Sequence, residues 1–274
     1  MQTNYSSNLS VNSHKCNRLK NCRLLNYYCE IIEIHTNEEG NYTITSHSTK
    51  NLVGYTYENN FTLLDLNTNA IESDDDSHYN SQFKITLYRP ANISFLLIVT
   101  TAQELEQGHF SITVHGPSNV SMQYHSKFTE PIVQSNYSSE LNNKSSKHTS
   151  FNCRQLDHYY EALEINVNTS GFYLFSTESS LNTTGYLYEH EFNPYDSIDN
   201  SLARSDDSCD SSQLKLIAYL KFNITYILIV TTKYTDVNRQ GPFSLFVKGP
   251  NEIKIKQMSM YTSINFNLIT IKLF

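Results

Sequence analysis

The sequence predicts an all-β chain of two tandem, homologous β-sandwich domains joined by a polar linker. Three observations predict this class: an internal repeat, short apolar runs with the two-residue period of strands, and turn residues at regular spacing. No helical period of useful length appears in the chain. Its 274 residues are enough for two domains of ordinary size.

The internal repeat aligns residues 21–101 with residues 152–232 at a constant offset of 131, and 34 of these 81 positions are identical. The matched motifs are Asn-Cys-Arg at 21 and 152, Gly-Tyr-x-Tyr-Glu at 54 and 185, Asp-Asp-Ser at 75 and 206, and Ile-Val-Thr-Thr at 98 and 229. We therefore expect a polar N-terminal segment (1–20), a first sandwich (21–122), a Ser- and Asn-rich linker (123–151), a second sandwich (152–256) and a C-terminal tail (257–274).

The strands of the first repeat are expected at 30–34, 42–45, 54–61, 83–88, 95–99 and 110–114. Runs 83–88 and 110–114 alternate apolar and polar residues, which is typical of strands with one solvated face. Run 95–99 is continuously apolar, so we expect a central strand that is buried on both faces. The second repeat follows the same order, from 163–165 to 243–247.

Composition and charge exclude some classes of partner. The formal net charge is −7, with 20 Lys+Arg against 27 Asp+Glu, and no basic field indicates nucleic acid or an anionic membrane. No apolar run approaches the roughly 20 residues of a membrane-spanning helix. We therefore expect no nucleic-acid partner and no membrane span.

The order of the repeated motifs resembles the pre-peptidase C-terminal (PPC) domain family, over about residues 28–116 and 159–249. The motifs are Gly-Tyr-x-Tyr, an Asp-Asp-Ser turn, a Gln-Phe-Lys type strand, an Asn-x-Thr/Ser turn, an apolar strand and a closing Phe-Ser-x-x-Val. The resemblance implies a compact sandwich of jelly-roll type, usually a non-catalytic appendage of secreted enzymes or a repeat of surface proteins. Some members bind calcium, but this chain lacks the family's Asp-x-Asp-Leu motif at the stretches before Glu58 and Glu189.

Two acidic turns are the candidate metal sites. Asp75 and Asp76, with Asp206 and Asp207 in the second repeat, offer the oxygen ligands that Ca²⁺ prefers. Adjacent strand residues point to opposite faces, and Asp at turns commonly caps its own backbone amides. Turn capping without metal is therefore the preferred interpretation, calcium is the alternative, and no other cofactor is expected.

Five cysteines are present: Cys16, Cys22, Cys29, Cys153 and Cys209. A disulfide between Cys153 and Cys209 is expected within the second repeat, while in the first repeat Cys22 pairs with either Cys16 or Cys29. One thiol is then left over. The absence of C-x-x-C argues against a zinc site, and a fully reduced set is the alternative.

Asn-x-Ser/Thr acceptor sites for glycosylation are frequent. We expect glycans at Asn41, Asn60, Asn92, Asn119, Asn168, Asn182 and Asn223, with further sequons at Asn4, Asn8, Asn136 and Asn143. Glycosylation indicates an extracellular or cell-surface protein. Residues 1–30 show no signal peptide, so we expect a fragment of a longer secreted protein; a cytoplasmic chain with chance sequons is the alternative.

No catalytic constellation is recognisable, because the sequence lacks G-x-S-x-G, H-E-x-x-H, P-loop and G-x-G-x-x-G motifs. We therefore expect a non-catalytic pair of binding or adhesion modules that attaches to matrix, glycan or a protein partner, with tyrosine-rich faces as candidate contacts. The alternatives are accessory, substrate-targeting domains of a secreted hydrolase or peptidase, a small hydrolase, and a structural spacer.

Overall fold

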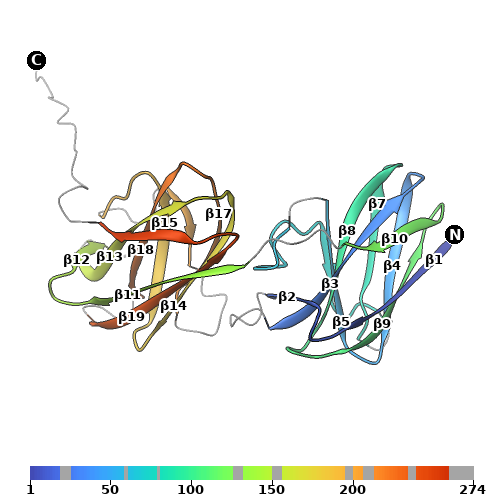
Figure 1. Cartoon of the computed structure of the whole chain (residues 1–274), viewed down its shortest axis with the longest axis horizontal. Helices are drawn as coiled ribbons and strands as arrows, with labels where there is room; N and C mark the ends of the chain where they lie inside the picture. The colour runs from blue at the N-terminus through green and yellow to red at the C-terminus, as the bar shows by residue number, and fades with distance from the viewer. Residues whose placement is uncertain are drawn as a thin grey trace, which may run out of the picture. The chain divides into compact units, whose positions relative to one another are not determined.

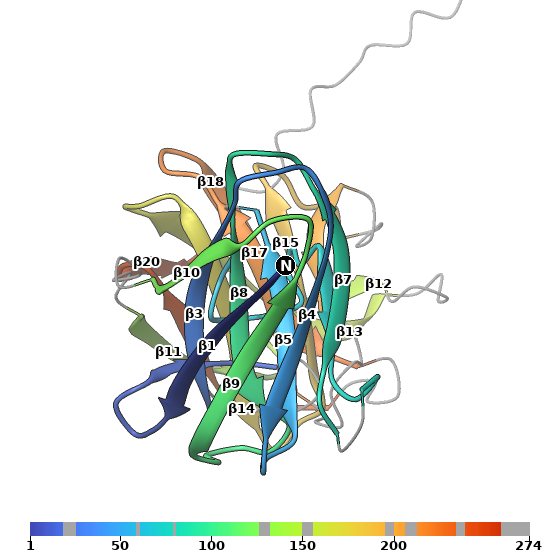
Figure 2. The same ribbon diagram turned by 90° about the vertical axis from the view of Figure 1, so that its right-hand side faces the viewer.

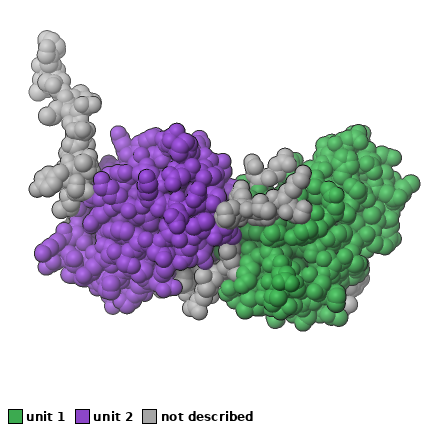
Figure 3. Space-filling model, viewed as in Figure 1, with its two compact units in different colours: residues 1–130 green, residues 131–274 purple. Residues whose placement is uncertain are grey.

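The computed structural model describes residues 1–18, 26–58, 61–78, 81–125, 132–149, 156–194, 200–205, 213–233 and 239–258. The chain divides into two compact units, Met1–Glu130 and Pro131–Phe274 (Figure 3). Both are all-β, as the sequence predicts (Figure 1). No helix in the described part is long and apolar enough to cross a bilayer.

Each unit has ten strands within the described residues, and the two sets correspond one to one. Unit 1 contains β1 (Gln2–Leu9), β2 (His14–Cys16), β3 (Tyr27–Thr36), β4 (Gly40–Ser48), β5 (Leu52–Tyr57), β6 (Glu72–Asp74), β7 (Lys84–Arg89), β8 (Ile93–Thr101), β9 (Gly108–His115) and β10 (Val120–Tyr124). Unit 2 contains β11 (Val133–Leu141), β12 (Ser146–Thr149), β13 (Leu156–Val167), β14 (Gly171–Ser179), β15 (Thr183–Glu189), β16 (Ser201–Arg204), β17 (Lys215–Leu220), β18 (Thr225–Thr232), β19 (Gly241–Gly249) and β20 (Ile253–Gln257).

Both units are antiparallel sandwiches with the strand order of a jelly roll. In unit 1 a four-stranded sheet has the order β1-β9-β4-β7, and Figure 2 shows β1, β9 and β4 side by side. The second sheet has the order β10-β3-β8-β5-β6, with β2 also paired to β3. Unit 2 repeats this as β11-β19-β14-β17 and β12-β13-β18-β15-β16, with β20 on β13. Such double Greek-key winding closes one apolar core between two sheets.

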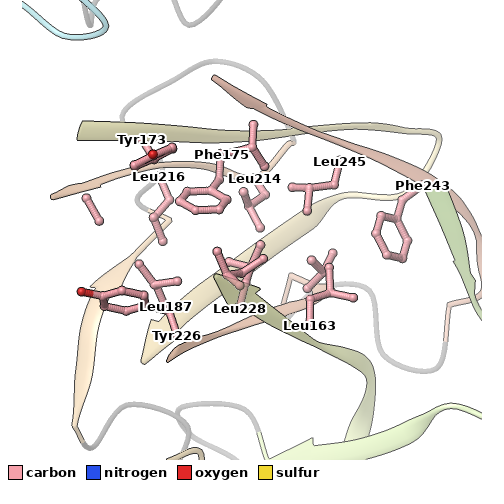
Figure 4. Packing of buried hydrophobic residues seen from close by; sticks show 14 of the residues in the cluster. Leu163, Tyr173, Phe175, Leu187, Leu214, Leu216, Tyr226, Leu228, Phe243 and Leu245 are labelled. Atoms are coloured by element: carbon pink, nitrogen blue, oxygen red, sulfur yellow. The ribbon is translucent and has the colours of Figure 1, made fainter. Parts of the chain in front are cut away.

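Side chains at alternate strand positions fill the core of each unit. In unit 2, Tyr173 and Phe175 of one sheet face Leu187, Tyr226 and Leu228 of the other (Figure 4). Each of these five side chains is almost completely buried. The two-residue period read from the sequence is the pattern that such a two-layer core requires.

Strand β8 is the predicted central strand. It lies between β3 and β5, and Phe95–Val99 is buried throughout. Phe95, Leu97 and Val99 pack into the core between the sheets, whereas Leu96 and Ile98 pack into a second cluster on the outer side of the six-stranded sheet. Leu63 and Leu66, from the loop between β5 and β6, complete that second cluster. The continuous apolar run follows from this burial on both faces.

The predicted domain boundaries require a correction at two places. Strands β1 and β2 lie in the segment expected to be outside the first sandwich, yet they pair with β9 and β3. Strands β11 and β12 lie in the expected linker, yet they pair with β19 and β13. The motif Asn-Tyr-Ser-Ser-x-Leu at 4–9 recurs at 136–141 with an offset of 132, one residue more than the offset elsewhere. The repeat therefore extends through both segments.

A buried carboxylate explains why this motif recurs. Glu30 on β3 is 6% exposed, and it accepts hydrogen bonds from the hydroxyls of Tyr5 at 2.5 Å and Ser7 at 2.6 Å on β1. Because β1 and β3 belong to different sheets, these bonds join the two layers along one side of the sandwich.

Unit 2 has the same arrangement. Tyr137 and Ser139 on β11 donate to Glu161 on β13, the latter at 2.6 Å. Burial, together with the bond to Glu161, raises the pKa of Tyr137 to about 12. The same causes raise the pKa of Tyr5. The charged acceptor thus stabilises both tyrosines in their neutral, donating form.

Candidate functional site

A surface pocket of about 190 Å³ lies on the outer side of the six-stranded sheet of unit 1. Asp75, one of the predicted metal ligands, is among the residues that line this pocket. The residues that line it come from β5, β6 and the turn after it, the chain after β2 and the loop between β5 and β6: Arg18, Val53, Tyr55, Asn67, Ser73, Asp74 and Asp75. The pocket therefore combines one cation, two carboxylates and several neutral polar groups.

Arg18 is a buried cation at this pocket. Its Nε donates to the Tyr55 hydroxyl at 3.1 Å, and its Nη1 donates to the Thr101 carbonyl at 3.1 Å. Its Nη2 lies 3.8 Å from Asp75 Oδ2, and the guanidinium lies over the Tyr27 ring, 5.6 Å from the centroid. These contacts orient the positive charge toward the acidic turn. Arg18 was not among the predicted site residues, because it lies in the segment expected to be a polar N-terminus.

The acidic turn of unit 1 brings three carboxylates together. One oxygen from each of Asp74, Asp75 and Asp76 lies within 4.8 Å of the others, a spacing that a cation could bridge. However, Asp74 Oδ2 accepts hydrogen bonds from the Ser77 hydroxyl and from the Lys84 amide, the latter at 2.5 Å. Asp74 therefore caps the turn, and the nearby Arg18 already neutralises part of the charge of Asp75.

Unit 2 retains the cap with another residue. Ser205 takes the place of Asp74, and its hydroxyl accepts the Lys215 amide at 3.2 Å. The predicted ligands Asp206 and Asp207 lie outside the described residues. Both repeats thus cap this turn with a side-chain oxygen, which Asp74 supplies in unit 1 and Ser205 supplies in unit 2.

The structure pairs Cys16 with Cys29 in a disulfide between β2 and β3. This corrects the expectation that Cys22 would pair with one of them. Both cysteines are buried, at 0% and 1% exposure, and the pairing of β2 with β3 brings them together. The expected bridge between Cys153 and Cys209 lies outside the described residues, as does Cys22.

Unit 2 has His148 and Tyr160 at the two positions equivalent to this disulfide. Their rings meet edge to face, with centroids 5.7 Å apart. His148 is buried, and its Nε2 lies 2.9 Å from the Thr231 hydroxyl. An aromatic contact therefore occupies in unit 2 the place of the covalent link in unit 1.

The predicted glycosylation sites lie at the surface wherever the structure describes them. Asn41, Asn92, Asn119, Asn168 and Asn223 are exposed, and Asn182 is partly exposed. Asn60 lies outside the described residues. Asn92 and Asn223 are repeat equivalents that adopt φ angles of 57° and 66° in the turn before β8 and β18. Asparagine tolerates this left-handed conformation better than most residues.

The outer face of each four-stranded sheet carries a half-exposed tyrosine at an equivalent position. Tyr88 on β7 is 60% exposed, and Tyr219 on β17 is 50% exposed. The Tyr88 hydroxyl lies 3.4 Å from Glu39 Oε2, and the Tyr219 ring meets the Phe172 ring edge to face at 5.2 Å. These rings are flat apolar surfaces with a hydroxyl at one end, which suits stacking against a sugar ring or a protein side chain.

Comparison with known proteins adds no relative: no family model matches the chain, and no curated protein matches it.

Proposed function

We propose that this chain is a non-catalytic pair of extracellular binding modules that attaches a cell surface or secreted protein to glycan or matrix. The observation that carries the proposal is the exposed tyrosine at equivalent positions of both units, Tyr88 and Tyr219. Two weak sites on one chain gain avidity, which gives a duplicated binding module an advantage that a duplicated spacer does not have.

Three further features support an extracellular location. The disulfide between Cys16 and Cys29 is typical of proteins from oxidising compartments. The described acceptor asparagines are at least partly exposed in both units, where glycans are tolerated. The resemblance to the PPC family points in the same direction, because its members are usually modules of secreted or surface proteins.

The proposal is tested with the full chain on glycan arrays and on immobilised matrix proteins. Tyr88→Ala and Tyr219→Ala should each weaken binding by about tenfold, and the double variant should weaken it more than either, since avidity needs both sites. Tyr124→Ala is the matched control, because Tyr124 is also exposed, at 48%, but Gln257 occupies its equivalent position in unit 2. Equal binding by the double variant and the control, or no binding by the wild type, would contradict the proposal.

The two acidic turns are the candidate calcium sites of this chain. A metal that binds only the folded state raises the melting temperature. If calcium binds these turns, it raises the melting temperature of the full chain, and Asp75→Ala/Asp76→Ala or Asp206→Ala/Asp207→Ala reduces this rise. If the melting temperature is the same in calcium and in chelator, these aspartates serve the turns alone.

A further inference from the structure

The pocket on the outer side of the six-stranded sheet of unit 1 contains a buried cation that the sandwich fold does not require. Arg18 is 6% exposed and lines the pocket. Its sequence counterpart in the second repeat is Ser150, at the offset of 132 that relates β1 to β11. Unit 2 nevertheless has the same strand order as unit 1. Because a buried charge lowers stability unless its partners compensate for the lost hydration, an arginine in one unit alone points to a role in binding.

Two hydrogen bonds hold the guanidinium of Arg18 in place and leave its third nitrogen without one. Nε donates to the Tyr55 hydroxyl and Nη1 donates to the Thr101 carbonyl, each at 3.1 Å. Nη2 lies 3.8 Å from Asp75 Oδ2, which is within ion-pair distance but too long for a hydrogen bond. Within the described part of the chain, Nη2 makes no hydrogen bond. Its N–H groups are therefore the donors that Arg18 offers to a ligand.

The other lining residues offer acceptors, further donors and a small apolar surface. Asp75 contributes a carboxylate whose side chain is 40% exposed. Ser73 and Asn67 are exposed, and Ser73 lies opposite Tyr55 in the pairing of β6 with β5. Among the described residues, the Ser73 hydroxyl and the Asn67 side-chain oxygen have no hydrogen-bond partner. Val53 and Tyr55 supply the apolar part of the wall. The pocket can thus donate and accept several hydrogen bonds at once.

The charges of the wall argue against a ligand with a net charge. An anion would meet the carboxylates of Asp74 and Asp75, whereas a cation bound to Asp75 would meet the guanidinium of Arg18 beside it. Arg18 is not free to turn away, because two of its nitrogens are hydrogen-bonded. A neutral ligand with hydroxyl groups meets neither repulsion, since each hydroxyl both donates and accepts.

The size of the pocket limits this ligand to a single ring. Its volume is about 190 Å³. A cavity of roughly 150 Å³ holds one benzene ring, whereas pockets for drug-sized ligands measure about 300–1,000 Å³. A pyranose is a six-membered ring with several hydroxyls, so it combines this size with the hydrogen bonding of the wall. Its C–H groups suit contact with Val53 and Tyr55.

We propose that this pocket binds one pyranose residue of a neutral glycan. Arg18 Nη2 donates to an oxygen of the sugar, Asp75 accepts from one of its hydroxyls, and Ser73 and Asn67 bind neighbouring hydroxyls. The choice of a glycan among neutral polar ligands rests on the proposed function, but the site is a separate one. Tyr88 lies on β7 in the four-stranded sheet, whereas the pocket lies on the six-stranded sheet. Unit 1 thus supplies a pocket for one sugar residue in addition to its exposed tyrosine.

The test is titration of the full chain with the methyl pyranosides of glucose, galactose, mannose, xylose and N-acetylglucosamine, followed by saturation-transfer NMR. At least one should bind with a Kd on the order of 1 mM, as expected for a ligand of about a dozen non-hydrogen atoms. Asp75→Ala should weaken binding by about tenfold, and Asn67→Ala and Ser73→Ala by about threefold each. Glu72→Ala is the matched control, because Glu72 is an exposed carboxylate on β6 that is not among the lining residues.

The variants are chosen so that loss of folding does not imitate loss of binding. Asn67 and Ser73 are exposed, so their alanine variants should melt at the temperature of the wild type. Absence of binding by every pyranoside at about 20 mM, roughly twenty times the expected Kd, would overturn the proposal. Unchanged binding in Asp75→Ala and Asn67→Ala, or equal weakening in Glu72→Ala, would overturn it as well.

Other ligands and the tyrosine sites are separated by further arms. Calcium chloride, sodium sulfate and glycine are the probes for a cation, an anion and a zwitterion. If one of them binds in an Asp75-dependent manner and no pyranoside does, the pocket takes a charged ligand and the proposal is wrong. The Tyr88→Ala/Tyr219→Ala variant should bind the pyranoside like the wild type. Loss of pyranoside binding in that variant would place the sugar at the tyrosines, whereas failure of the pocket alone leaves the glycan-array result for Tyr88 and Tyr219 unaffected.

Discussion

Removal of the Glu30 carboxylate tests whether the repeated polar contact between the two sheets stabilises the fold. Glu30→Ala leaves the hydroxyls of Tyr5 and Ser7 without their charged acceptor. Hydrogen bonds to charged groups contribute about 1.5–3 kcal/mol each, and the lower value applies because both donors are partly exposed. We therefore expect a loss of about 3 kcal/mol in the free energy of unfolding, or about 10 °C in melting temperature for a unit of this size.

A conservative variant gives the second arm of this experiment. Glu30→Gln keeps the shape, and its amide can still accept from one hydroxyl and donate to the other. Only the charge assistance is lost, so we expect a cost of about 1 kcal/mol. Glu161→Ala should reproduce the large effect in unit 2, since its partners Tyr137 and Ser139 are equivalent.

The assay is scanning calorimetry of the full chain, with hydrogen exchange of β1 as a local readout. Glu33→Ala is the matched control, because Glu33 lies on the same strand but its side chain is 30% exposed. If Glu30→Ala costs no more than Glu33→Ala, or if exchange in β1 does not rise, the carboxylate does not hold β1 against the second sheet and the reasoning fails.

Three further predictions concern stability. Reduction of the bond between Cys16 and Cys29, which lie 13 residues apart, should lower the free energy of unfolding by about 3 kcal/mol, measured by denaturant titration with and without reductant; an unchanged midpoint would contradict it. In Gly116→Ala the added methyl would lie 2.2 Å from a ring carbon of the buried Tyr42, so we expect the free energy of unfolding to fall by about 1–3 kcal/mol. Gly241→Ala, whose methyl would have its nearest contact at 3.4 Å, should lower it less. Equal melting temperatures of the two variants would refute the packing argument. Tyr137 binds its proton more tightly in the folded state, so its contribution to stability is complete below about pH 10 and is lost as the pH rises toward about 12. The free energy of unfolding of Tyr137→Phe, measured against pH, should therefore lack the decrease between about pH 10 and 12 that Tyr137 causes in the wild type.

The repeat, the two-layer core and the central strand β8 could be predicted from the sequence because each leaves a local pattern. Alternation in Phe110–Val114 and continuity in Phe95–Val99 report directly how many faces of a strand are buried. The spacing of turns and the doubled motif order then indicate two sandwiches. These features depend on residues close in the chain.

The edge strands β1 and β11 were missed for a physical reason. Their outward positions are occupied by Gln, Asn, Ser and Glu, and their inward tyrosine and serine residues serve a buried carboxylate more than an apolar core. Such a strand has the composition of a loop. A one-residue change of offset between the repeats also hides the matching Asn-Tyr-Ser-Ser motif from a gapless alignment.

The sequence by itself determined the all-β class, the duplication and the set of surface asparagines. Only the tertiary structure decided that Cys16 bonds Cys29, that Arg18 faces Asp75, and that Ile217 lies opposite Leu174. Each of these contacts depends on which strands pair and in which register. Register is set by the packing of the whole sandwich, so residues that meet across a sheet leave no signal in their separation along the chain.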